Sequence, residues 1–197
     1  MEDLTIQAKT EAFIANLEQA KHATLFNSGV SAISSLLATC ETGSTVVVPD
    51  DFYSGTRYLM NKCFGERFKY EVIKSDTQLE DLERYLNEGN VSMVMVESPT
   101  NPLLQVYDIK NIANIVKNFR KDNIQKPFFV VDTTFCPPIF QNPLNLGADL
   151  VMHSATKFLG GHSDALAGVI CTNSSDLYKQ ILATRFQMGN HLEDFTS

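Results

Sequence analysis

The chain has no run of basic residues and no excess of positive charge. Its 197 residues include 16 Lys and Arg against 23 Asp and Glu, which gives a net charge of -7 and a pI near 5.0. Nonspecific nucleic-acid binding needs clustered Lys and Arg to neutralise phosphates, and anionic membranes attract basic surfaces. The composition therefore argues against both nucleic acid and membrane as partners.

Long apolar runs and paired cysteines are also missing. The longest apolar stretches, such as Val91–Val96 and Phe128–Val131, are far too short to span a bilayer. The N-terminus has no basic segment followed by an apolar core, so it does not resemble a secretory signal. The four cysteines are scattered without a CxxC pair, which argues against a disulfide framework. We expect a soluble protein of the reducing cytoplasm.

Several common ligand motifs are absent as well. There is no GxGxxG and no GxxxxGK[ST], so a dinucleotide site or a P-loop has no direct support. The four histidines have no metal-ligand spacing with one another or with the cysteines, and we expect no metal site.

What the sequence does contain is a regular alternation of helical and strand patterns. Helices are predicted over 5–21, Ser31–Thr39, Ser54–Cys63, Leu79–Leu86, Ile109–Phe119 and Ser175–Met188. Strands are predicted over Ala23–Phe26, Thr45–Val48, Phe68–Ile73, Ser92–Val96, Phe128–Val131, Leu150–Met152 and Gly168–Cys171. The strands are continuous apolar runs, which indicates burial on both faces. The pattern predicts an α/β fold with a mostly parallel, doubly wound sheet, and a single domain over residues 1–197.

Ligands of such sheets bind beyond the carboxyl ends of the strands, so the residues after each strand are the candidates. Ser28 and Gly29 follow the first strand and open a helix, where free backbone N–H groups and the helix dipole favour an anion such as phosphate. The alternative is that Ser28 or Asn27 only caps the helix.

Asp132 ends a strongly apolar strand, and Lys157 follows another strand. A carboxylate in an apolar setting needs a cationic partner to stay charged, and a protonated heteroaromatic nitrogen would serve. Lys157 lies between hydroxyl residues and Gly160-Gly161, a setting in which a lysine can act as a Schiff-base nucleophile. The alternatives are a structural cap for Asp132 and a solvated surface position for Lys157.

The stretch from Asp149 to Ser163 resembles the lysine signature of the pyridoxal-phosphate (PLP)-dependent Cys/Met metabolism family, the trans-sulfuration enzymes. Four further segments resemble motifs of the same family in the same order. They are Phe26–Ile33 (phosphate turn), Pro49–Thr56 (stacking tyrosine), Glu97–Pro102 (asparagine loop) and Val131–Phe135 (aspartate motif). The resemblance implies the large domain of a fold-type I PLP enzyme.

The resemblance also implies a role for each matching residue. Lys157 would bind the cofactor covalently and move protons, and Asp132 would pair with the pyridine nitrogen. Tyr53 would stack on the ring and assist catalysis, and Asn101 would bind its phenolic oxygen. The phosphate would be held by a last group of residues, namely Ser28, Gly29, Val30, Ser154 and Thr156.

The implied activity is β- or γ-elimination or replacement on sulfur amino acids of the cystathionine, cysteine or homoserine-ester class, in a homo-oligomer. The family's N-terminal arm and C-terminal small domain are expected to be missing, and Arg185 near the end is predicted to be a solvated helix residue. The alternatives are a truncated, catalytically incompetent PLP-binding chain or partner of a full-length relative, and an unrelated α/β phosphate-ligand protein.

Overall fold

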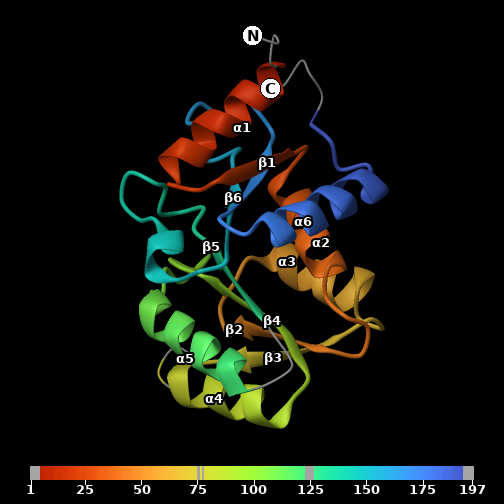
Figure 1. The fold of residues 1–197 in the computed structure, drawn as a ribbon, viewed down its shortest axis with the longest axis vertical. Helices are drawn as coiled ribbons and strands as arrows, with labels where there is room; N and C mark the ends of the chain where they lie inside the picture. Colours follow the sequence, from red (N-terminus) through yellow and green to blue (C-terminus); the bar gives the residue numbers. More distant parts are fainter. Residues whose placement is uncertain (1–4, 75, 77, 123–126, 193–197) are drawn as a thin grey trace.

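A seven-stranded sheet forms the centre of the molecule (Figure 1). The structure, a computed structural model, describes residues 5–74, 76, 78–122 and 127–192. The strands are β1 (His22–Phe26), β2 (Thr45–Pro49), β3 (Lys69–Ile73), β4 (Val91–Glu97), β5 (Phe128–Asp132), β6 (Leu150–Ser154) and β7 (Gly168–Thr172). Their order is β1-β7-β6-β5-β4-β2-β3, and β7 is antiparallel to both of its neighbours while the other pairs are parallel.

Helices cover both faces of this sheet. They are α1 (Ile6–Leu17), α2 (Gly29–Ala38), α3 (Ser54–Tyr58), α4 (Gln78–Glu88), α5 (Ile109–Asp122) and α6 (Ser175–Met188). In Figure 1, α2, α3 and α6 lie together on one side, α4 and α5 pack side by side on the other, and α1 lies against β1. The predicted α/β fold with a mostly parallel, doubly wound sheet is confirmed.

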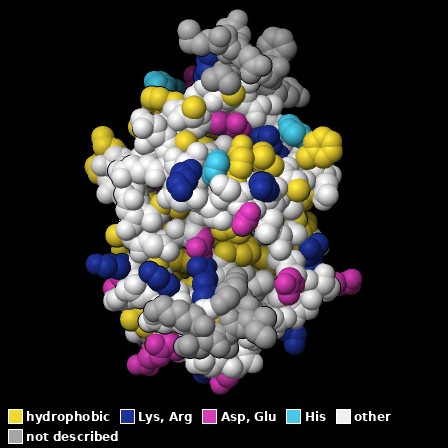
Figure 2. Space-filling view, in the orientation of Figure 1, with side chains coloured by type: hydrophobic (Ala, Val, Ile, Leu, Met, Phe, Trp, Pro, Cys, Tyr) yellow, Lys and Arg dark blue, Asp and Glu magenta, His cyan; other side chains and the backbone are white. Residues whose placement is uncertain are grey.

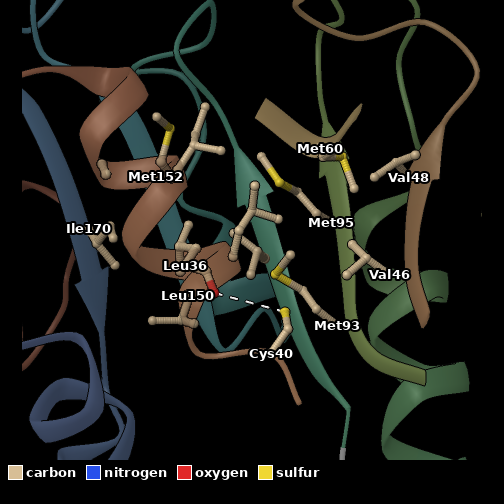
Figure 3. Packing of buried hydrophobic residues seen from close by; sticks show 14 of the residues in the cluster. Leu36, Cys40, Val46, Val48, Met60, Met93, Met95, Leu150, Met152 and Ile170 are labelled. Carbon is tan, nitrogen blue, oxygen red and sulfur yellow. Dashed lines mark hydrogen bonds between the residues drawn. The ribbon is translucent and has the colours of Figure 1, made fainter. Parts of the chain in front are cut away.

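Alternate residues of the central strands enter different apolar clusters. In β4, Met93 and Met95 pack with α2, whereas Val94 and Val96 pack with α4 and α5. Figure 3 shows the first cluster, in which Met93 and Met95 from β4 lie near Leu150 and Met152 from β6. Each fully buried apolar side chain contributes roughly 1.5–3 kcal/mol, and burial on both faces explains why the strand sequences are apolar throughout.

Three local expectations differ from the structure. The helix predicted over Ser54–Cys63 is α-helical only to Tyr58 and continues as the π-helix η1 (Leu59–Cys63). A short 3-10 helix, η2 (Pro143–Leu146), lies in a segment where no helix was predicted. The first helix ends at Leu17 rather than at residue 21.

The spacing of four apolar residues in the first helix, Ile6, Phe13, Ile14 and Leu17, predicts that they lie on one side, and the structure differs. Ile14 is buried, but Ile6 and Phe13 are 61% and 63% exposed. Ile6 and Phe13 are seven positions apart and therefore share one face of the helix. Ile14 follows Phe13 directly and so points about 100° away from it around the helix axis. The four apolar residues therefore do not form one core-facing stripe.

Arg185 is not the solvated residue that the sequence suggested. Its guanidinium lies 3.2 Å from Glu11 and donates to the carbonyl of Leu25 at 3.0 Å, and its side chain is only 13% exposed. The expectation failed because the helical pattern of α6 cannot show that α1 supplies a carboxylate beside it. This pair connects α6 to α1 and β1.

On the surface, basic and acidic side chains are interspersed over the face shown in Figure 2. None of the helices in the described ranges is long and apolar enough to cross a membrane.

Candidate active site

One cavity of about 550 Å³ opens at the carboxyl ends of the parallel strands. Its walls come from the segments that follow β1, β2, β4, β5 and β6. All nine residues that the sequence singled out line it, namely Ser28, Gly29, Val30, Tyr53, Asn101, Asp132, Ser154, Thr156 and Lys157. The strand-end reasoning therefore selected residues that are neighbours in space.

The turn after β1 is held by close backbone contacts. The hydroxyl of Ser28 accepts the N–H of Ser31 at 3.1 Å and so caps α2. A Cβ on Gly29 would lie 2.9 Å from the Cβ of Ser154, so only glycine allows β6 to approach this closely. The first N–H groups of a helix have no intrahelical acceptor, and those of Gly29 and Val30 stand at the cavity wall. Ser28 is thus a cap at a site suited to an anion.

The segment after β6 brings hydroxyl groups and an amine to the same wall. The backbone N–H of Ser154 donates to the hydroxyl of Thr134 at 2.8 Å. The hydroxyl of Thr156 exchanges hydrogen bonds of 3.2 Å with the backbone of Ala167, which fixes its position. Lys157 lines the cavity with an exposed side chain.

Asp132 lies at the end of β5 and is almost fully buried. Its Oδ1 accepts two hydrogen bonds from Thr134, from the backbone N–H at 2.9 Å and from the hydroxyl at 2.7 Å. Burial raises the pKa of the Asp132 carboxyl, while the hydrogen bonds from Thr134 and the nearby His153 act in the opposite direction. A cation placed at this carboxylate would be stabilised strongly.

Glu97 is a buried carboxyl in this cavity that the sequence analysis did not single out. It ends β4 and is the register partner of Asp132 in β5. Its Oε2 accepts the backbone N–H of Tyr53 at 2.7 Å. Burial and the neighbouring Asp132 raise its pKa from 4.5 to about 8. Its position directly after a buried strand, like that of Asp132, was the signal that could have identified it.

The loop that carries Asn101 is held by another buried carboxylate. Asp51, which follows β2, accepts the hydroxyl of Thr100 and the backbone N–H of Leu103, the latter at 2.9 Å. The backbone N–H of Gln105 in turn donates to the hydroxyl of Thr100 at 2.9 Å. Asn101 therefore stands on a loop with fixed ends.

Nine further residues, to which the sequence analysis assigned no individual role, complete the cavity. The rings of Phe135 and Phe158 meet edge to face with centroids 6.4 Å apart. The other lining residues are Ile33, Glu97, Thr134, Met152, Gly161, Ser163 and Leu166. All of them except Leu166 lie within the segments that carry the family motifs, and only the structure shows that they line the cavity.

The arrangement of a lysine, a buried carboxylate, an aromatic ring and an anion-binding turn agrees with a comparison against protein families. Residues 4–197 match the Cys/Met metabolism PLP-dependent enzyme family. The chain belongs to this family.

Individual relatives show the same relationship. The chain is 40% identical over 180 residues to a cystathionine gamma-lyase of Dictyostelium discoideum, a match that covers 91% of this chain and 44% of the relative. It is 39% identical to a cystathionine gamma-synthase/O-acetylhomoserine (thiol)-lyase of Bacillus subtilis, over 95% of this chain and 48% of the relative. The crystal structure of cystathionine gamma-lyase from yeast superimposes with a TM-score of 0.89 at 35% identity, over 96% of this chain and 47% of that one. The chain thus spans about half the length of these relatives.

Proposed function

We propose that residues 1–197 form the PLP-binding large domain of a trans-sulfuration-type enzyme. Its reaction is β- or γ-elimination or replacement on a sulfur amino acid of the cystathionine, cysteine or homoserine-ester class. The observation that carries the proposal is the single cavity that contains Lys157, Asp132, Tyr53 and the first turn of α2. The family of the chain and the names of its relatives give the substrate class.

The residues present fit the cofactor in size and in chemistry. Free N–H groups at the start of α2 and the hydroxyl of Ser154 suit a phosphate group. Because Gly29 has no side chain, the first turn of α2 lies close to Ser154. Asp132 supplies the negative charge that a protonated pyridine nitrogen requires. The cavity of about 550 Å³ is of the size that small cofactors occupy.

When bound, the cofactor supplies an electron sink for the carbanion that forms at the substrate Cα. The chain's own residues then have distinct tasks. The Lys157 amine would hold the cofactor aldehyde and move protons at Cα and Cβ of the substrate, whose leaving group would depart from Cβ or Cγ. Tyr53 would stack on the ring and assist catalysis, and Asn101 would bind the ring's phenolic oxygen. A homo-oligomeric assembly is part of the proposal because the family's active sites are completed between subunits.

A second candidate function is a PLP-binding chain without catalytic turnover, or a partner of a full-length relative. This alternative keeps the cofactor site and loses only the reaction.

The experiment that tests the proposal is an absorption spectrum of the purified chain with added PLP. We expect a visible band of protein-bound cofactor that survives desalting and is lost in Lys157→Ala. The control Lys179→Ala changes an exposed lysine of α6 outside the cavity and should leave the band intact. A folded wild-type chain without a band would refute the cofactor site. A band without sulfide or keto-acid release from cystathionine or cysteine would favour the non-catalytic alternative.

A further inference from the structure

Glu97 is a buried carboxyl of the cavity to which the resemblance to the family assigns no role. It lies on the same face of the sheet as Asp132, since the two are register partners in the parallel strands β4 and β5. Both side chains are buried, at 7% and 5% exposure, and Glu97 lines the cavity. Two carboxylates side by side in an apolar setting rarely both carry a charge.

The first role of Glu97 concerns the segment of Tyr53. Its Oε2 accepts the backbone N–H of Tyr53 at 2.7 Å, directly before α3 begins at Ser54. The backbone of Asn101 also hydrogen-bonds to this carboxyl. One side chain from β4 thus binds the backbone of two loops, each of which contributes a residue to the cavity wall.

The second role concerns charge. Asp132 receives two hydrogen bonds from Thr134, which favour its ionised form. Burial raises the pKa of Glu97 to about 8 together with two neighbouring carboxyls, Asp132 from β5 and Asp51 from the segment after β2, while the hydrogen bonds from the backbone of Tyr53 and Asn101 act in the opposite direction. Lys157, from the segment after β6, is the basic residue among those lining the cavity. Burial raises the pKa of Asp132 as well, and each carboxyl accepts two hydrogen bonds, so the neighbouring charges make the difference: Glu97 lies beside two carboxyls, Asp132 and Asp51, whereas His153 lies near Asp132 and lowers its pKa. On this ground we place the proton on Glu97 and the negative charge on Asp132.

We propose that Glu97 is a positioning residue of the cofactor site that holds the Tyr53 segment and keeps a proton beside Asp132, so that a single negative charge faces the ring nitrogen. The proposal rests on the proposed function, because it concerns residues assigned there to the cofactor ring. It adds a residue that sets both the geometry and the charge of that site.

The first test uses the chain without cofactor, so that its outcome does not depend on PLP binding. Urea unfolding is measured from pH 5 to 9 for the wild type, for Glu97→Gln and for Glu71→Gln, an exposed carboxyl on β3. A carboxyl whose pKa is raised in the folded state stabilises at low pH and loses that contribution as the pH approaches the folded value. The unfolding constant of the wild type, divided by that of Glu97→Gln, should rise by up to tenfold for each unit by which the pH increases and should level off above about pH 8. Glu71→Gln should follow the wild type.

The second test measures the affinity for PLP by absorbance titration at pH 6.5. Glu97→Gln keeps an oxygen acceptor for the Tyr53 N–H and should bind within about threefold of the wild type. Glu97→Ala removes the acceptor and should bind at least tenfold more weakly. If Glu97→Ala binds PLP as tightly as the wild type, Glu97 has no positioning role. If the unfolding constants of the wild type and of Glu97→Gln depend on pH in the same way, Glu97 does not hold the proton. A wild type that binds no PLP would instead refute the proposed function, while the pH profile would still decide the protonation of Glu97.

Discussion

Gly168 is the position at which a single added methyl group should disturb both the fold and the candidate site. It begins β7 and pairs with Phe26 of β1 and with Ser154 of β6. A Cβ there would lie 2.2 Å from the carbonyl oxygen of Ser28 and 2.9 Å from the Cα of Gly29. Both are backbone atoms, so no side chain can rotate away, and the strand and the turn must separate by about 1 Å to restore ordinary contact.

The expected cost follows from that displacement. Adding a methyl group to a packed interior costs roughly 1–3 kcal/mol, and contact with backbone on two sides favours the upper end. For a chain of this size each kcal/mol lowers Tm by roughly 2–4 °C, so Gly168→Ala should melt about 6–12 °C lower. Because the displaced turn carries the N–H groups assigned to the phosphate, the affinity for PLP should fall at least tenfold, in line with the large effects of ~1 Å displacements in active sites.

Circular dichroism melting and absorbance titration with PLP measure the two effects. The matched control is Val169→Ala, which removes a buried side chain of the next residue on the other face of β7. It should lower stability by about 2 kcal/mol and leave PLP affinity unchanged. If Gly168→Ala loses stability but binds PLP as tightly as the control does, the link between β7 and the turn is refuted. If it also melts like the wild type, the close approach itself is wrong.

Two further predictions concern the free energy of unfolding, measured with urea. Arg185→Met should lower it by about 2–3 kcal/mol, because Glu11 would lose its charge partner in a mostly buried site. The control Arg84→Met removes a 50% exposed arginine from a surface pair and should lower it by less than about 1 kcal/mol, and equal losses would contradict the burial argument. Ser28→Ala should cost about 1 kcal/mol through loss of the helix cap and Ser28→Thr much less, and an Ala variant as stable as the wild type would show that the cap contributes nothing.

Much of the fold could be predicted because its strands are apolar on both faces. Runs such as Thr45–Val48 and Phe128–Val131 differ from the observed β2 and β5 by a single residue at the end. The errors arose where tertiary contacts decide. The sequence of η1 is compatible with an ordinary α-helix. Ile6 and Phe13 of α1 point outward because the face that meets β1 and α6 carries Glu11, Ile14 and Ala15.

The site was predictable to the extent that it follows strand ends. Asp132 ends the apolar strand β5 and Lys157 follows the end of β6 within a few residues, so the topology alone predicts that they share an edge. Thr134 and Phe135 follow β5 at the same edge, but their residue types gave no reason to assign them a role, and Leu166 could not be identified in this way because it lies in the loop before β7. The hydrogen bonds of Thr134 to Asp132 and Ser154 illustrate the point, since no local pattern indicates them.

The two carboxyl groups that end β4 and β5 show where stability and chemistry conflict. Val96 and Val131, the residues just before them, are fully buried and stabilise the sheet, whereas Glu97 and Asp132 extend the same strands with groups that lose favourable hydration. A sequence selected for stability alone would continue the apolar run or turn outward. The backbone N–H of Tyr53 and the hydroxyl of Thr134 offset part of this loss, and a bound cation at Asp132 would offset more. We therefore expect the folded chain without cofactor to be less stable than its core would allow, and a cofactor bound at this edge would restore part of the difference.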